Sequence, residues 1–276
     1  MTSTRDIRSK IRTVRNIEQI CRAMKTVSSI RLRRAEQRLA RVWPYHRKLT
    51  ELVSYLAAVT QAHPFLQQRP VAKTGLVLVT SDRGLCGGYN AAAARAALAV
   101  GSPNDTVAIA VGRKGLVHLR QHGYQLVDQL APLGGEPEVA AVYALAERVG
   151  RRYLDGEIDR LVVVYTQFLG GTRGQVRAEA VLPVLPLPTP PADIIFEPAP
   201  AAMLPGLMRR YLQHAIFGAM LEAAASEHAA RVAAMTAASD NAEEMIQRLT
   251  LDYNKARQAA ITKELIEIVS AAGAAA

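Results

Sequence analysis

Several residue classes are scarce in this sequence. Aromatic residues make up only 5% of the 276 residues, whereas half are hydrophobic, a balance that favours close helix–helix contacts over a broad β core. The two cysteines, Cys21 and Cys86, are too few for a disulfide framework. They fit a reducing compartment as small buried side chains, although a bond between them stays open. No apolar run approaches the ~18 residues of a membrane span, and residues 1–10 lack the apolar segment of a secretory signal.

Acidic residues are rare at the amino end. Residues 1–48 contain fourteen Lys or Arg against three Asp or Glu, so this segment carries +11 where the whole chain carries +10. The basicity therefore belongs to one segment. A patch of this kind favours an acidic partner, which could be nucleic acid, anionic lipid or acidic protein loops.

Proline is absent after Pro205, and beyond that point glycine occurs only at Gly206, Gly218 and Gly273. The intervening residues are mostly good helix formers. We therefore expect a helix that starts at Pro205-Gly206 and stops at Gly273, with a length of roughly 100 Å at 1.5 Å per residue. A globular core cannot cover such a helix, so it must lie against another long helix.

The amino-terminal segment is the only candidate for that second helix. Between Arg5 and Ala58, apolar residues recur mostly every three or four positions, which indicates one apolar face of a long helix. The steps do not follow a strict heptad, so we expect an irregular coiled coil. Pro44 should interrupt it by bending or loosening the helix, and His63-Pro64 should end the pattern.

The middle third shows short apolar runs that alternate with helical segments. This alternation predicts crossover units and a Rossmann-like, mainly parallel α/β domain. The whole chain is thus an α/β fold inserted between antiparallel N- and C-terminal coiled-coil helices, with boundaries at 1–62, 70–200 and 205–276. The expected strands cover 75–80, 107–111, 124–130, 160–168 and 176–185, and the expected helices cover 91–98, 112–122 and 136–154.

The Gly-rich stretch at residues 80–90 follows the first expected strand, where a phosphate-binding loop would lie. Its glycines do not match the dinucleotide or P-loop spacing, so a structural turn is the better interpretation and Cys86 is a buried thiol. His118 and His122 share helical spacing but lack a third ligand nearby in sequence, which favours a solvated helix face over a metal site. No pair of side chains suggests acid–base or nucleophilic catalysis. We expect no cofactor, no metal and no catalytic residue.

Two features of the expected C-terminal helix have more than one interpretation. Asp240 and Glu243 could form a variant capping box that restarts a helix, or Asp240 could lie on the wet face of a continuous one. Gln258 and Thr262 share a helix face, and taken alone they predict only a solvated stripe.

Several motifs together resemble the γ subunit of F-type ATP synthase, in that family's order and over nearly the full length. They are RDIRSKI at 5–11 with ICRAMK at 20–25, TSDRGLCGGYN at 80–90, SEHAAR at 226–231, SDNAEE at 239–244 and YNKARQAAITKEL at 253–265. Cys21-Arg22 stands where the family commonly has Thr-Lys, a difference that keeps the charge. The resemblance agrees with the fold that periodicity predicts.

This resemblance implies a central-stalk rotor, present in one copy per complex. The terminal helices would turn inside a ring of α and β subunits, and the α/β domain would stand beside ε on the c-ring of the membrane rotor. Ion flow would turn the chain and drive ATP synthesis or hydrolysis at the β subunits, so the chain itself is not catalytic. Its place would be peripheral, on the cytoplasmic face of the bacterial plasma membrane.

The resemblance also implies contact residues. Arg22, Met24 and Lys25 would face acidic loops of β, and the apolar residues 265–269 would turn in an apolar collar. Glu197 would lie at the foot, near the c-ring. From the C-terminal helix, the residues expected to engage β are Arg231, Arg257, Gln258 and Thr262.

Two other functions stay open on the residues alone. A basic helical nucleic-acid-binding protein would use residues 1–48 on phosphates, although Trp43 is the first aromatic residue of that helix and one apolar face is committed to a partner. A nucleotide-dependent enzyme would use the Gly-rich turn. The resemblance favours the rotor over both.

Overall fold

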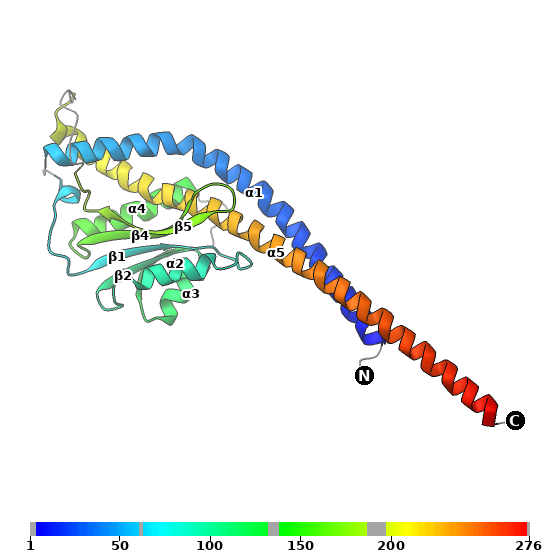
Figure 1. Ribbon diagram of the computed structural model, residues 1–276. Coiled ribbons are helices and arrows are strands. Elements are labelled where there is room, and N and C mark those ends of the chain that lie inside the picture. Colours follow the sequence, from blue (N-terminus) through cyan, green and yellow to red (C-terminus); the bar gives the residue numbers. More distant parts are fainter. Residues whose placement is uncertain (1–3, 61–62, 132–137, 187–196, 275–276) are drawn as a thin grey trace. The chain divides into compact units, whose positions relative to one another are not determined.

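The computed structural model describes residues 4–60, 63–131, 138–186 and 197–274 (Figure 1). The chain forms two compact units, one of Met1–Val27 with Val232–Ala276 and the other of Ser28–Arg231. We call them the helical unit and the sheet unit. Two long helices, α1 (Thr4–Val59) and α5 (Pro200–Ala274), each contribute one part to both units.

A five-stranded sheet organises the sheet unit, in the order β3-β2-β1-β4-β5. The first four of its strands in chain order are parallel and β5 is antiparallel to β4. Every residue of β1 and β2 is buried, which explains why their sequences show no polar alternation. The strands are β1 (Thr74–Val79), β2 (Thr106–Val111), β3 (Gln125–Leu130), β4 (Arg160–Phe168) and β5 (Gly174–Leu182).

Helices cover both faces of this sheet and enclose two cores (Figure 1). Side chains such as Leu78 face α2 (Tyr89–Leu98) and α3 (Arg113–Gln121). The alternate side chains, such as Val77, pack in a larger core with α4 (Val139–Leu154), the short 3-10 helix η1 (Pro64–Leu66) and the parts of α1 and α5 that belong to this unit. The predicted mainly parallel α/β arrangement is therefore confirmed.

The two long helices lie side by side within each unit, as the sequence predicts (Figure 1). In the sheet unit, the rings of Tyr45 on α1 and His214 on α5 are 4.7 Å apart. In the helical unit, Arg22 and Glu243 form an ion pair of 3.6 Å across the two helices. Each helix thus covers part of the other's apolar face, which an isolated helix would leave in water.

The predicted ends of the two long helices differ from the structure. Helix α5 begins at Pro200, five residues before the predicted start, and Pro205 lies inside it. Proline is favoured at a first helical position, because the missing N–H would have no partner there. Pro205, the sixth residue of the helix, instead lacks the N–H that would donate to the Ala201 carbonyl. Helix α1 continues through Pro44 and ends at Val59, before the predicted break at His63-Pro64. A bend or loosening at Pro44 stays a prediction.

Smaller features follow the same physical rules. Helix α5 does not restart at Asp240, which is exposed on a continuous helix, so the wet-face interpretation is correct. Strand β5 ends at Leu182, before the predicted Leu185, because Pro183 cannot donate to the ladder. Cys21 and Cys86 are both buried and free. Residues 136 and 137, part of the predicted fourth helix, lie outside the described residues.

Candidate functional site

The helical unit is a two-helix pair with small side chains at its contact. From α5, residues at helical spacing are buried, namely Met235, Ser239 and Ala242. From α1, Ile7 and Cys21 are each 8% exposed. Side chains of this size let two helices approach closely, so the pair is closed along one side by residues that are mostly small.

The outward sides of the same pair carry large apolar side chains in contact with water. On α1, Ile17 and Ile20 are 49% and 58% exposed, and on α5 Leu251 and Ile268 are 62% and 65% exposed. Apolar side chains that recur along one element in this way mark an interaction surface. On α1, the exposed basic residues Arg15 and Arg22 flank Ile17 and Ile20, which adds a positive charge to that surface.

Six predicted contact residues belong to this pair. Arg22 and Lys25 are exposed and Met24 is half-buried. Arg22 is held by Glu18 at 2.6 Å, one turn away on its own helix, as well as by Glu243. On α5, three further residues are all exposed, namely Arg257, Gln258 and Thr262. Of the predicted collar residues 265–269, Leu265, Ile266 and Ile268 are exposed. A partner of the helical unit can therefore touch each of these side chains at the surface.

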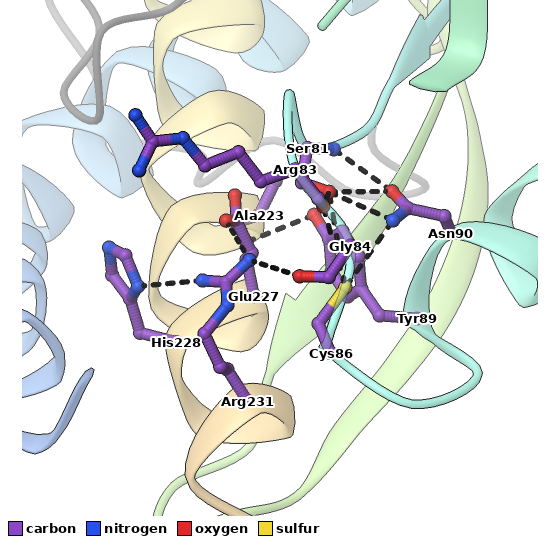
Figure 2. A network of polar contacts seen from close by, with 10 residues as sticks. All are labelled: Ser81, Arg83, Gly84, Cys86, Tyr89, Asn90, Ala223, Glu227, His228 and Arg231. Carbon is purple, nitrogen blue, oxygen red and sulfur yellow. Dashed lines mark hydrogen bonds and ion pairs between the residues drawn. The ribbon is translucent and has the colours of Figure 1, made fainter. Parts of the chain in front are cut away.

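The remaining two predicted contact residues belong to the sheet unit. Glu197 is exposed and lies just before α5. Arg231, by contrast, is only 7% exposed. Its guanidinium donates to Glu227 Oε1 at 2.7 Å, to the Gly84 carbonyl at 3.3 Å and to His228 Nδ1 at 3.4 Å (Figure 2). Arg231 is therefore committed to contacts inside the chain.

The environment of Arg231 explains these contacts. Burial, together with the positive charges of Arg231 and Arg31, lowers the pKa of His228 to about 4, so the imidazole is neutral at pH 7 and can accept a hydrogen bond. Burial raises the pKa of Glu227, and the Arg231 charge opposes that shift. A buried carboxylate and a buried guanidinium each need the other, since either alone would be costly.

The turn that Arg231 reaches is tightly hydrogen-bonded (Figure 2). Asn90 Oδ1 accepts from the Ser81 backbone N–H at 3.0 Å, and Asn90 Nδ2 donates to Ser81 Oγ at 2.8 Å. Cys86 is 2% exposed, and burial raises the pKa of its thiol, which disfavours the thiolate that a nucleophile needs. These are the properties of a structural turn.

This turn lies at a special place in the sheet. The strand order reverses between β1 and β4, and open α/β sheets bind ligands outside the carboxyl ends of the strands at such a point. In this chain, helix α5 lies at the carboxyl ends of the strands, at that point of the sheet. The Tyr89 hydroxyl donates to the Ala223 carbonyl at 3.0 Å, and Arg231 binds Gly84. The chain's own helix thus packs where a nucleotide would lie, which argues against the nucleotide-dependent enzyme.

Glu222 is an acid buried between α5 and the sheet, with 3% of its surface exposed. Burial raises its pKa to about 7, and the charge of Glu179 contributes in the same direction. Hydrogen bonds from Phe168 N–H and the Gln167 side chain oppose the shift. Among the described residues, Glu222 Oε2 and Gln167 Oε1 have no hydrogen-bond partner. At neutral pH, Glu222 is therefore close to half protonated.

This pKa predicts a pH-dependent stability. The folded pKa is raised, so the contribution of Glu222 is fully present below its unfolded value near 4.5 and is lost as pH rises through about 7. Glu222→Gln should remove that loss and make the chain more stable at pH 8 by up to about 3 kcal/mol. Urea unfolding of both chains at pH 5 and pH 8 measures the difference. Glu244→Gln, an exposed acid on the same helix, should show no such change, and equal pH slopes for wild type and Glu222→Gln would contradict the assignment.

The residues that the structure describes contain no group of three or more His, Cys, Asp or Glu side chains placed to hold a metal ion. His118 and His122 stack with ring centroids 4.1 Å apart. No helix in the described ranges is both long and apolar enough for a membrane span.

Two features of this site were missed by sequence reasoning. The i,i+4 spacing of Glu227 and Arg231 suggests an ion pair, but nothing local indicates that Gly84, 147 positions away, accepts from the same guanidinium. The burial of Glu222 is likewise set by a strand distant in sequence. Both depend on long-range contacts that periodicity does not encode.

Comparisons with known proteins agree on one family. The sequence profile described as ATP synthase matches residues 3–275. A protein of Desulfitobacterium hafniense, named ATP synthase gamma chain, is 39% identical over 279 residues, which cover 99% of each chain.

Solved structures share the fold at lower identity. One chain comes from the OSCP/F1/c-ring part of Euglena gracilis mitochondrial ATP synthase, with a TM-score of 0.72 at 22% identity, over 98% of this chain and 94% of that one. Another comes from the central stalk and c-ring of the Tetrahymena thermophila enzyme, with a TM-score of 0.63 at 23% identity, over 80% of this chain and 99% of that one.

Proposed function

The chain belongs to the family of ATP synthase gamma chains, which makes it the central-stalk rotor subunit of that enzyme, and from this premise we propose how its surfaces are used. The exposed sides of the helical unit turn inside the ring of α and β subunits. The sheet unit stands on the c-ring beside ε. One copy serves three β subunits, and the chain couples ion flow to ATP chemistry that takes place on β.

The observation that carries this proposal is the outward surface of the helical unit. Its exposed apolar side chains, such as Ile20 and Leu251, need a partner, while the basic residues of its segment 1–27 attract an acidic one over a long range. A partner with an apolar collar and acidic loops, as we propose for the ring of α and β subunits, would complement both features of this surface. Coupling then results from differential contact of one asymmetric surface with three catalytic states.

We assign individual partner contacts to the predicted residues whose side chains reach the surface. We assign contact with acidic β loops to Arg22, Met24 and Lys25, and contact with β further along the helical unit to Arg257, Gln258 and Thr262. Glu197 is assigned to the foot, near the c-ring. The complex would lie on the cytoplasmic face of a bacterial plasma membrane, held there through its partners.

Native isolation tests this function. The chain, tagged at its amino end, should co-purify with α, β, ε and c subunits at one copy per three β. A free stable monomer as the only species in the extract would contradict the proposal. If the purified chain instead bound DNA tightly, with a steep salt dependence, the nucleic-acid alternative would replace it.

A further inference from the structure

Helix α5 is attached to the sheet unit by two kinds of contact. Most of its buried side chains there are apolar, among them Met208, Ile216 and Met220. Apolar packing is strong but non-directional, so by itself it fixes the helix axis better than the rotation of the helix about that axis. A shaft that transmits torque also needs contacts that resist rotation.

Polar contacts of that directional kind occur at the end of the sheet. Arg231 donates to the Gly84 carbonyl and Tyr89 donates to the Ala223 carbonyl, so the turn and the helix each hold the other (Figure 2). Along α5 the two attachment points are eight residues, or about 12 Å, apart. Two points so spaced resist both sliding and rotation of the helix.

The guanidinium of Arg231 is oriented before it meets the turn. Glu227 and His228, one turn or less away on α5, accept from it at 2.7 Å and 3.4 Å. The guanidinium of arginine is planar, so once two of its N–H donors are bound, it loses little further conformational entropy when it forms a third hydrogen bond. Because side chains extend about 5–6 Å from a helix axis, a rotation of roughly 10° would move the group by about 1 Å. That shift would break the bond to Gly84, which is already 3.3 Å long.

We propose that Arg231, with Glu227 and Tyr89, forms a torsional clasp that locks α5 to the 80–90 turn, and that Arg231 acts in coupling as a positioning residue inside the chain. The function of the clasp in coupling rests on the proposed rotor function. The existence of the clasp does not depend on the rotor function, because the reactivity of the Cys86 thiol measures directly whether the turn is held. Cys86 lies within the turn, is 2% exposed and accepts a hydrogen bond from Asn90 Nδ2 at 3.3 Å, so its thiol reacts only when the turn opens. We expect a turn that is no longer held by α5 to open more often.

The experiment uses the assembled, membrane-bound complex with Cys21→Ala in this chain, so that Cys86 is the chain's remaining thiol. Arg231→Gln with Glu227→Gln removes both charges and leaves no unpaired ion. Tyr89→Phe weakens the second attachment without opening a cavity. The matched control is Arg248→Gln with Glu244→Gln, an exposed pair of the same spacing on the same helix.

Labelling of Cys86 by N-ethylmaleimide, read by mass spectrometry of this chain, should be about tenfold faster or more in the double variant, the factor expected from loss of a charge-assisted hydrogen bond. Tyr89→Phe should change it less, in the same direction, and the control not at all. Ions pumped per ATP hydrolysed should fall in the double variant while hydrolysis continues. Restoring Arg231 beside Glu227→Gln should recover part of that ratio.

Each outcome decides one claim. Unchanged labelling of Cys86 in both the double variant and Tyr89→Phe would show that there is no clasp. Faster labelling with an unchanged pumping ratio would show a clasp without a role in coupling. If the double variant fails to assemble, Tyr89→Phe decides by the same two measurements. Failure of the rotor function would appear separately, as a wild-type complex that lacks this chain.

Discussion

Replacing Gly112 by alanine is expected to destabilise the chain by about 3–5 kcal/mol, the size reserved for backbone strain and buried clashes. Gly112 joins β2 to α3 with a φ of 90°, and a Cβ there would lie 2.2 Å from the backbone oxygen of Thr80. Thr80 cannot yield, because its N–H donates to Val111 and its hydroxyl accepts from Gly115 N–H at 2.7 Å. Urea unfolding of the full-length chain, or its soluble yield, measures the loss.

Gly123→Ala is the matched control for this prediction. Gly123 has a similar φ of 76°, but nothing lies within 4 Å of a Cβ built there. It should therefore cost only the left-handed backbone strain, about 1–2 kcal/mol. Equal losses at the two positions would mean that the contact with Thr80 is not what requires glycine at Gly112.

The second large effect is expected on function. Changing Arg257, Gln258 and Thr262 together to alanine should lower ATP synthesis by the assembled complex about tenfold or more, which corresponds to a few lost contacts of ordinary strength. All three side chains are exposed, so the stability of the chain should change by less than about 0.5 kcal/mol. Synthesis in inverted membrane vesicles and unfolding of the purified chain measure the two quantities.

Asp252→Ala provides the control for this variant. Asp252 is also exposed on α5, but at 3.6 residues per turn it lies about 140° around the helix from Arg257, about 120° from Gln258 and about 80° from Thr262. It should leave synthesis unchanged. Normal synthesis in the triple variant would contradict the assignment of these residues to a partner contact, as would an equal loss in Asp252→Ala.

The sequence predicts the elements that depend on local pattern. The apolar run at 160–168 and the helical spacing of residues 5–58 are seen as β4 and α1, because periodicity and burial coincide there. The pairing of the terminal helices also follows, since a helix as long as α5 cannot bury its apolar residues alone. Their family resemblance agrees with this but is not needed for it.

The sequence is least informative where distant contacts override local signals. Pro205 suggests a helix start, yet the helix already begins at Pro200 and packs Leu204 into the core. Arg231 belongs to a motif that suggests a partner surface, yet its guanidinium binds Gly84 in the turn. In both cases, tertiary packing of α5 against the sheet unit decides the outcome, and no local pattern records it.

Direct observation of rotation tests the central claim. A cysteine introduced at Leu169, which is 47% exposed, would carry a bead, since both native cysteines are buried. In a complex fixed to a surface through its β subunits, ATP should turn the bead in one direction, with three equal pauses per revolution. A bead that stays still on complexes that hydrolyse ATP would contradict the account.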